Sequence, residues 1–448
     1  MKINRRKFVA ASMSLGVAAV SSVADSHAQA SAPSAPSRPD PNRWRRNEKI
    51  QQGRRMASSL LQPSERDLER GLALHAEALV CDVYGLGVHS APDTAPLNLA
   101  VQAGASAPEY QDLRLESTTT RHVQDAVERE EYIDAWEAAG VTCVFQNAGE
   151  EGQWPMQMLR RLSSHTFVGD CMRGHMIRAA LPQDIVAAKK QHLRCNYLTT
   201  NGVPLQQEWN SVEEELYLIR LFFNLGVRMM HLTYSRRNMI GDGCAEPSDA
   251  GLSDFGRRVV REMNRIGVIV DLAHSGWKTS LEAARHAQKP VVISHSACAA
   301  LNHHVRCQPD EVIRAVADTG GYIGITCVPR FLGGTGDIRA LLDHIDYVVK
   351  KFGADHVAIG TDTPFSSRTA SASIVGTPRS RPKWATFGTA DNWTDRPEMR
   401  LSMLWTNWPL FTVGLVQRGH SEETIRKIIG GNMMRVARAV LPPWIPTT

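Results

Sequence analysis

The chain has 448 residues, 43% of them hydrophobic, which suffices for two or three domains or for one α/β barrel with insertions. Its formal net charge is +5, and residues 1–30, with four basic residues and one acidic residue, account for +3 of it. The remainder is nearly neutral and has no basic stripe with interleaved aromatic residues, so we expect no nucleic-acid partner.

The N-terminal residues have the pattern of an export signal. Residues 4–8 (NRRKF) precede a modest apolar run at 9–20 and a small-residue cleavage site, AQA, at 28–30. Paired arginines followed by Lys-Phe are typical of a bacterial twin-arginine signal, and an ordinary secretory signal is the alternative. The run is too short to span a membrane. We therefore predict a signal peptide at residues 1–30 and a periplasmic protein without a stable membrane anchor.

Residues 31–63 are predicted to precede the folded domain. Residues 31–41 (SAPSAPSRPDP) form a Pro/Ser-rich linker, and residues 43–55 are basic and compatible with a helix. A clear helical pattern begins at Ser64, with Glu65 and Asp67 in its first turn. We predict a single domain from residue 64 to residue 448.

Buried-type strands alternate with helical patterns over this domain. The expected strands are residues 79–84, 141–146, 197–201, 227–234, 268–274, 291–295, 322–328 and 356–362. The expected helices are residues 122–139, 212–225, 252–266, 277–287, 309–319 and 337–352. Eight such units predict an α/β fold, a (β/α)8 TIM barrel, with an open doubly wound sheet as the rival. No G-x-G-x-x-G follows a strand, which weakens a dinucleotide-binding interpretation.

Two insertions interrupt the alternation, and a helical segment follows it. Residues 85–121 follow the first strand and residues 364–399 follow the last, so either is a candidate lid or subunit contact, with a solvated decoration as the alternative. Residues 421–440 have a capped helical pattern that Gly430 and Gly431 are expected to divide.

The most informative stretch is residues 267–306, GVIVDLAHSGWKTSLEAARHAQKPVVISHSACAALNHHVR. It has the order strand, His274, helix, strand, His295, loop. A βαβ unit places its strands in parallel, so both imidazoles are expected at the same carboxyl edge of the sheet. Neighbouring strands are about 5 Å apart, which allows two histidines to share one metal ion. A pair of structural core histidines is the alternative.

Polar residues at the other strand ends complete a candidate site. Two imidazoles can hold Zn²⁺, which acidifies a coordinated water, and Asp362 could accept its proton. Arg306 offers a planar fork suited to a carboxylate. A surface arginine and a structural ion pair are the respective alternatives for Arg306 and Asp362.

These residues resemble the membrane dipeptidase (renal dipeptidase) family of zinc metallopeptidases, family M19. The resemblance rests on VDLAH ending at His274, KPVVISHS around His295, VRCQPDEV containing Arg306, AIGTD ending at Asp362, and HSEETIRKIIGGNMMRV near the C-terminus. It implies a (β/α)8 barrel that cleaves dipeptides at a binuclear zinc site. By position, it implies His274 and His295 as ligands of one zinc, Arg306 as the clamp on the substrate carboxylate, and Asp362 as the acidic residue.

The chain departs from the family at several ligand positions. Tyr84 and Leu86 stand where the family has a His-x-Asp pair on the first strand, and Gln207 stands near the position of its bridging glutamate. Tyr234 replaces a histidine at the end of the fourth strand, and we place Tyr234 with Arg306 among the substrate-binding residues. Phenol, alkyl and amide groups cannot replace imidazole and carboxylate ligands. One metal site is therefore expected to be lost.

The departures leave three hypotheses. The favoured one is a dipeptidase-family hydrolase with one Zn²⁺ on His274, His295 and a third ligand among Asp82, Glu208, Asp362 and water. The second is a hydrolase on the same barrel that acts on another amide or ester or works without a metal, and the third is an inert periplasmic binding protein. The expected partner is a small dipeptide-like substrate with a free carboxylate, and the resemblance implies a tendency to form homodimers.

Overall fold

The computed structural model describes residues 42–149, 154–208, 210–368, 378 and 393–441. The predicted signal peptide, the Pro/Ser-rich residues 31–41 and most of the insertion at 364–399 lie outside the described residues. Pro41–Thr448 form one compact unit, and the fold is that of this unit alone.

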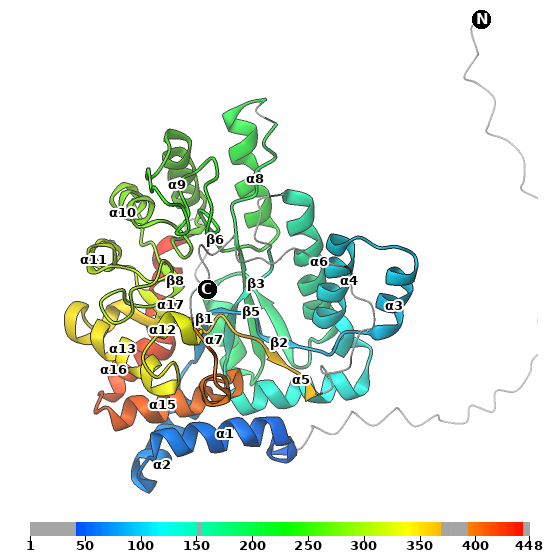
Figure 1. Ribbon diagram of the computed structural model, residues 1–448, viewed down its shortest axis with the longest axis vertical. Coiled ribbons are helices and arrows are strands. Elements are labelled where there is room, and N and C mark those ends of the chain that lie inside the picture. The colour runs from blue at the N-terminus through cyan, green and yellow to red at the C-terminus, as the bar shows by residue number, and fades with distance from the viewer. Residues whose placement is uncertain (1–41, 150–153, 209, 369–377, 379–392, 442–448) are drawn as a thin grey trace, which may run out of the picture. The chain divides into compact units, whose positions relative to one another are not determined.

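Parallel strands surrounded by helices form the centre of the unit (Figure 1). The described strands are β1 (Cys81–Gly85), β2 (Val88–His89), β3 (Cys143–Asn147), β4 (Met176–Ala179), β5 (Arg194–Thr200), β6 (Met229–His231), β7 (Ile269–Asp271), β8 (Ile293–Ser296), β9 (Ile323–Ile325), β10 (Val357–Ile359) and β11 (Phe365–Ser366). All eight predicted strands are present, as β1, β3 and β5 to β10. The strands β2, β4 and β11 were not predicted.

The strands follow one another in barrel order. One parallel sheet has the order β1-β3-β5-β6-β7, with β4 paired to β5, and a second has the order β10-β9-β8. Between β7 and β8, Leu272 N donates to Val292 O (2.8 Å) and Val292 N donates to Val270 O (3.0 Å). Between β10 and β1, Asp362 N donates to Tyr84 O (3.1 Å). These few bonds, rather than continuous ladders, join the two sheets of the (β/α)8 arrangement.

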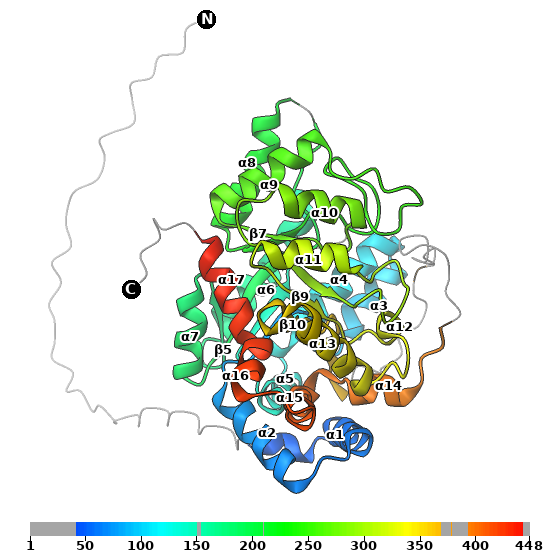
Figure 2. The same cartoon turned by 90° about the vertical axis from the view of Figure 1, so that its left-hand side faces the viewer.

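Helices cover the outside of the strands (Figure 2). They are η1 (Arg43–Arg46), α1 (Glu48–Leu61), α2 (Glu65–Glu77), α3 (Thr94–Gln102), α4 (Ala107–Thr120), η2 (Arg121–Val123), α5 (Ala126–Ala139), α6 (Pro155–Cys171), α7 (Pro182–Lys190), α8 (Val212–Asn224), α9 (Asp254–Ile266), α10 (Trp277–His286), α11 (Asp310–Asp318), α12 (Pro329–Leu332), α13 (Ile338–Phe352), η3 (Ala354–His356), α14 (Pro397–Ser402), η6 (Trp405–Asn407), α15 (Trp408–Gln417), α16 (Glu422–Arg426), η7 (Lys427–Gly431) and α17 (Asn432–Val440).

The predicted helices are confirmed as α2, α5, α8 to α11 and α13, with ends shifted by a few residues. Local signals set several of these ends. The side chain of Ser64 accepts from Asp67 N at the start of α2, and Gly267 ends α9 in the left-handed conformation, with φ 105°. Helix α15 was missed because every residue from Trp408 to Val416 is buried, so the helix has no polar face to give a period.

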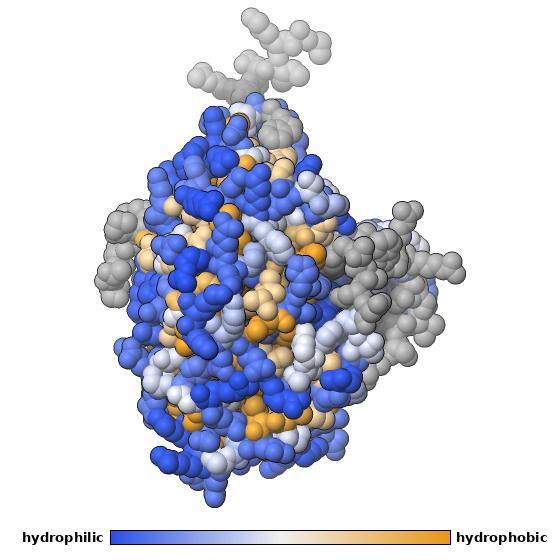
Figure 3. Space-filling view, turned by 60° about the vertical axis from the view of Figure 1, so that its left-hand side comes forward, coloured by the Kyte–Doolittle hydropathy of each residue, from blue (hydrophilic) through white to orange (hydrophobic). Residues whose placement is uncertain are grey.

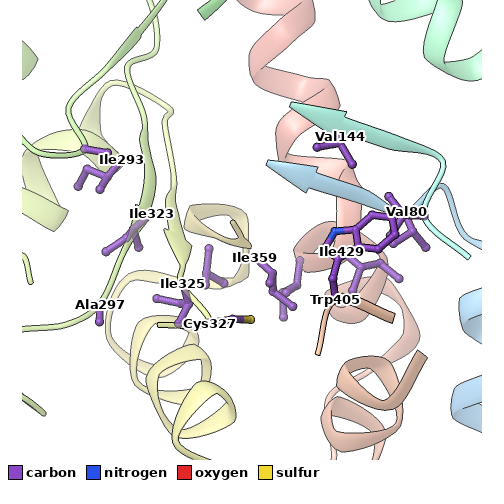
Figure 4. Packing of buried hydrophobic residues seen from close by; sticks show 14 of the residues in the cluster. Val80, Val144, Ile293, Ala297, Ile323, Ile325, Cys327, Ile359, Trp405 and Ile429 are labelled. Carbon is purple, nitrogen blue, oxygen red and sulfur yellow. The ribbon is translucent and has the colours of Figure 1, made fainter. Parts of the chain in front are cut away.

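The core has two parts, one on each face of the strands. Figure 4 shows the outer part, where Ile323, Ile325 and Ile359 from β9 and β10 lie opposite Val80 and Trp405. The inner part lies in the space enclosed by the strands and is formed by every second residue of each strand. Its members include Val83, Phe145, Tyr197, Met229 and Ile269. This alternation shows which side chains of each strand face inward.

The two ends of the described chain pack together. Helices α1 and α2 lie beside α15 in both ribbon views (Figures 1 and 2), and Gln417 Nε2 donates to Leu61 O (3.0 Å). Part of the predicted N-terminal segment, 31–63, therefore contacts the barrel through α1. The predicted division of the C-terminal helical segment is confirmed at Gly430, where an added Cβ would lie 2.1 Å from Leu79 O, two residues before β1.

The insertion at 85–121 contains β2, α3 and α4, and β2 pairs with β11 from the insertion at 364–399. The face in Figure 3 is mostly hydrophilic, with apolar residues in narrow strips, as expected for helices whose other side packs on strands. Among the helices that the structure describes, none combines the length and apolar character needed to cross a membrane.

Asp82 in β1 holds the seam with β10. Its Oδ1 accepts from Thr361 N (2.9 Å), and its Oδ2 accepts from Thr361 Oγ1 (2.6 Å) and from Trp405 Nε1 (3.0 Å). Burial raises the pKa of Asp82 to about 7, against the effect of these hydrogen bonds. The seam therefore contains a carboxyl group whose charge changes near neutral pH.

We expect Asp82→Asn to alter the pH dependence of stability. Between about pH 4 and pH 7 the folded wild-type chain binds more protons than the unfolded chain, so the contribution of Asp82 to the free energy of unfolding falls as pH rises through this window. Urea unfolding at pH 5 and pH 8 measures the free energy of unfolding of both proteins. The value for the variant minus that for the wild type should be larger at pH 8 than at pH 5. Parallel pH dependence of the two proteins would contradict this assignment.

Candidate metal centre

Two imidazoles meet where β7 and β8 end. His274 lies three residues beyond β7, His295 lies within β8, and both are buried. Their Nε2 atoms are 3.1 Å apart. Two nitrogens that share a tetrahedral zinc at about 2.0–2.1 Å are about 3.3 Å apart. The structure thus brings together the two residues predicted to be ligands of one ion.

Serine hydroxyls contact the other ring nitrogens of this pair. Ser235 Oγ lies 2.9 Å from His274 Nδ1, and Ser294 Oγ lies 2.9 Å from His295 Nδ1. When each Nδ1–H donates to its serine, both Nε2 atoms carry lone pairs that face each other. Burial, the charge of Arg306 and the neighbouring imidazoles hold the pKa of both histidines well below the usual value. Two neutral imidazoles with facing lone pairs suit a divalent transition metal.

Asp362 follows β10 and lies beside the pair. Its Oδ2 is 4.0 Å from His295 Nε2, and its side chain keeps 22% of its surface exposed. Its φ is 54° and that of His274 is 66°, a conformation that non-glycine residues adopt rarely and that is common at functional sites. Burial raises the pKa of Asp362 to about 6, against the charges of Arg306 and His231. This carboxylate can therefore accept a proton near neutral pH.

Arg306 is buried next to the same group. It is 0% exposed, its Nη2 donates to His295 O (3.2 Å), and its guanidinium lies 5.2 Å from the centre of the Phe331 ring. Its Nε and Nη1 atoms have no hydrogen-bond partner among the described residues. A buried cation with unused donors is suited to bind an anionic group, such as the carboxylate that the sequence predicted.

Two tyrosines stack on the histidines. The ring of Tyr84 lies 3.9 Å from that of His295, and Tyr84 OH donates to Asn201 Oδ1 (2.5 Å). The ring of Tyr234 lies 4.0 Å from that of His274. Both tyrosines stand at positions where the family has metal or substrate ligands, and here their rings hold the orientation of the imidazoles.

The structure separates the candidates for a third ligand. Both oxygens of Asp82 are engaged in the seam with β10, as described above. Glu208 is exposed, and its neighbour Gln207 is exposed as well. Asp362 Oδ2, at 4.0 Å from His295 Nε2, is the best placed of the three predicted carboxylates.

Sequence reasoning missed two residues that belong to the cluster, His231 and Asp271. Both are fully buried, and His231 Nε2 lies 2.7 Å from Asp271 Oδ2. Ligand atoms of His231, Asp271 and His295 lie within 4.8 Å of one another, a grouping that could hold a metal ion. Burial would raise the pKa of Asp271, but His231 and hydrogen bonds from Ser294 and Ala273 hold it below the usual value.

The alternation of side chains along a strand could have identified His231 and Asp271 from the sequence. Met229 and Ile269 belong to the inner part of the core. Because side chains alternate along a strand, His231 and Asp271, two residues further on, face inward as well. The predicted strand 227–234 extended past His231 to Tyr234, so His231 was not recognised as the residue at the strand end.

A family model of membrane dipeptidases (peptidase family M19) matches residues 180–370. Residues 180–370 of this chain are thus similar to the membrane dipeptidase family. All of the residues of the cluster described here, from His231 to Asp362, lie in the matched range, which confirms the resemblance seen in the sequence motifs.

Individual relatives agree with this assignment. Dipeptidase tcpJ of Claviceps purpurea (strain 20.1) is 32% identical over 228 residues, 50% of this chain and 47% of that protein. The chain spans about half the length of the curated relatives it matches (47% and 51%). The structure of an amidohydrolase from Pseudomonas aeruginosa is 25% identical with a TM-score of 0.60, covering 83% of this chain and 98% of that one. That of the probable dipeptidase PvdM from the same organism shares the fold, with 19% identity, a TM-score of 0.59, and coverage of 84% and 99%.

We expect His295→Ala to remove the bound metal. His295 contributes one of the two facing nitrogens. Without it, a single imidazole of the pair remains, which is too few protein ligands to retain about one zinc ion per chain. Metal analysis of dialysed protein tests this, with His75→Ala as the control for loss of a buried imidazole, since His75 bonds Thr412 and Ala139 far from the pair in the fold. Wild-type metal content in the His295 variant would contradict its role as a ligand.

Proposed function

We propose that this protein is a metal-dependent hydrolase that cleaves dipeptides or related small amides. The observation that carries the proposal is the pair of Nε2 atoms of His274 and His295, 3.1 Å apart, with each Nδ1 on a serine hydroxyl. A zinc ion bound there would supply Lewis acidity for a water and for the substrate carbonyl. The similarity of residues 180–370 to the membrane dipeptidase family supports the same reaction class.

Three residues of the chain would carry out proton transfer and substrate binding. Asp362, with a pKa of about 6, would take the proton of the attacking water and deliver it to the leaving amine. Arg306 would bind the substrate carboxylate through its unused donors. Tyr234 lies over the ring of His274 and would line the substrate side of the site.

We propose a single metal ion. Tyr84 cannot supply the ligand that the family places on the first strand, and its ring instead lies 3.9 Å from that of His295. Gln207, near the position of the expected bridging glutamate, is exposed. We further propose that the protein is exported to the periplasm, because residues 1–30 carry the twin-arginine pattern described above.

A second candidate function is hydrolysis of another small amide. A solved relative that matches 83% of this chain at 25% identity is described as an amidohydrolase. The substitutions at Tyr84 and Tyr234 change the surroundings of the histidines, which favours a substrate other than those of the typical family members.

Hydrolysis assays on zinc-loaded protein distinguish these functions. The panel would contain dipeptides with a free carboxylate, their C-terminal amides, N-acylated amino acids and simple esters, each with and without a chelator. Chelator-sensitive turnover of dipeptides supports the proposal, and turnover of the acylated amino acids alone supports the second candidate. A zinc-loaded protein that binds dipeptides without turnover would instead be a binding protein.

We expect Asp362→Asn to lower kcat by about 10²- to 10⁴-fold, the usual contribution of a general acid–base group. In the wild type, kcat/KM should rise with pH through about 6, because Asp362 must lose its proton to act as a base. The variant should lack this acidic limb. An unchanged pH profile in the variant would remove Asp362 from the role of base.

We expect Arg306→Ala to raise KM for dipeptides with a free carboxylate by about 10- to 100-fold, corresponding to about 1.5–3 kcal/mol for hydrogen bonds to a charged group. KM for the C-terminal amides should change much less, because an amide cannot accept the same paired bonds. Steady-state kinetics on matched acid and amide substrates measures the difference. Equal effects on both would exclude the carboxylate clamp.

A further inference from the structure

Asp271, the last residue of β7, is bonded to both segments of the chain that carry the facing histidines. Its Oδ1 accepts hydrogen bonds from Ala273 N and from Ser294 N, both at 3.0 Å. Ala273 directly precedes His274, and Ser294 directly precedes His295. A single carboxylate oxygen therefore joins the main chain next to one imidazole to the main chain next to the other.

The bond to Ser294 N extends the pairing of β7 with β8 beyond the last main-chain bond between them. Val292 N donates to a main-chain carbonyl of β7 (3.0 Å), and Ser294 N is the next donor of β8 on the same side. In a continuing parallel ladder its acceptor would be Leu272 O, which instead accepts from Ser275 N (3.1 Å). The carboxylate of Asp271 therefore supplies the acceptor that the main chain does not.

His231 in the neighbouring strand β6 contacts the other oxygen of this carboxylate. It lies opposite Asp271 in the register of β6 with β7, and its Nε2 is 2.7 Å from Asp271 Oδ2. Both residues are fully buried. Contacts on both oxygens fix the orientation of the carboxylate, as is required of a group that holds other residues in place.

The two bonds of Asp271 Oδ1 lead to the two imidazoles by short routes. Ser294, which donates its N to Asp271, has its Oγ 2.9 Å from His295 Nδ1. Ala273 precedes His274, whose φ of 66° lies in a region that non-glycine residues adopt rarely. Such a conformation persists only where the surrounding contacts hold it, and the bond from Ala273 N is one of these contacts.

We infer that Asp271 is a positioning residue that sets the distance between the Nε2 atoms of His274 and His295. It acts through Ala273 and Ser294 and does not itself bind the metal. The inference rests on the proposed function only in assuming that the two facing imidazoles hold a metal ion. Outer groups of this kind contribute to metal affinity because they keep the ligand atoms in the orientation that the ion needs.

The alternative role for Asp271 is that of a metal ligand. Ligand atoms of His231, Asp271 and His295 lie within 4.8 Å of one another, and Asp271 Oδ2 makes no hydrogen bond of regular geometry among the described residues. This grouping does not include His274, so it uses only one of the two facing nitrogens. The positioning role accounts for both nitrogens and for both bonds to Oδ1.

Two substitutions of similar size separate the two roles. Asp271→Asn keeps Oδ1 as the acceptor for both main-chain nitrogens, and its amide can donate to His231 Nε2. We expect it to lower the affinity for Zn²⁺, measured by competition with a chromophoric chelator, by less than about 10-fold. Asp271→Leu removes the acceptor, and we expect it to lower the affinity by about 10- to 100-fold, as is typical for the loss of an outer partner.

Asp184 in α7 provides the matched control, outside the cluster. One of its oxygens also accepts from two main-chain nitrogens, Ala180 N and Leu181 N, both at 2.8 Å. We expect Asp184→Leu to keep the wild-type affinity for Zn²⁺, although it loses bonds of the same kind. Circular dichroism and urea unfolding establish which variants are folded. If Asp271→Leu does not fold, Asp271→Ala replaces it, because the smaller side chain leaves room for water at the two N–H groups.

Visible absorption of the Co²⁺-loaded proteins gives a second measurement on the folded variants. A four-coordinate ion absorbs intensely, and displacement of an imidazole weakens or shifts the bands. We expect the wild-type spectrum in Asp271→Asn and an altered spectrum in Asp271→Leu. A change of stability alone would not alter the spectrum of the folded protein.

The outcomes separate this inference from the proposed function. Weak binding in Asp271→Leu, with near wild-type binding in Asp271→Asn and Asp184→Leu, supports the inference. An Asp271→Asn variant that loses at least as much affinity as Asp271→Leu would overturn it, because the charge rather than the acceptor would then matter. Wild-type affinity in Asp271→Leu, or an equal loss in Asp184→Leu, would also overturn it and leave the proposed function intact. A wild-type chain that binds no Zn²⁺ would overturn both.

Discussion

The parallel pairing of β7 with β8 is the constraint on which the site depends. The two sheets meet at this seam through the bonds between Leu272, Val292 and Val270. The register they set brings His274 and His295 to one edge and leaves their Nε2 atoms 3.1 Å apart. A shift of one residue would turn one of the two side chains to the opposite face of the sheet and separate the pair.

Burial gives this site its chemistry. It keeps the imidazoles neutral and therefore able to donate electron pairs, and it raises the pKa of Asp362 to about 6. The same burial leaves Nε and Nη1 of Arg306 without partners among the described residues, which is costly until an anionic group binds. A carboxylate that enters the site would relieve this cost, so binding and the charge state of the site are linked.

Strand β1 holds the seam between the two sheets and supports the histidine rings. Tyr84 covers His295 and bonds Asn201, and Asp82 ties β1 to Thr361 and Trp405. The strand that supplies metal ligands in the family here closes the seam and supports the rings of the cluster. The facing imidazoles of His274 and His295 lie instead where β7 and β8 end.

Much of this protein was determined by local sequence. Continuous β-branched runs, serine caps and glycine ends predicted the eight barrel strands, the main helices and the order of both, because these signals act over a few residues. They also predicted that His274 and His295 converge, since parallel neighbours share an edge. Only the tertiary structure decided the rest. Which face His231 and Asp271 occupy, and that Asp82 is engaged in the seam, depends on contacts between residues far apart in the chain. The sequence pattern around a residue does not show such contacts, because they form only when distant segments of the chain pack together.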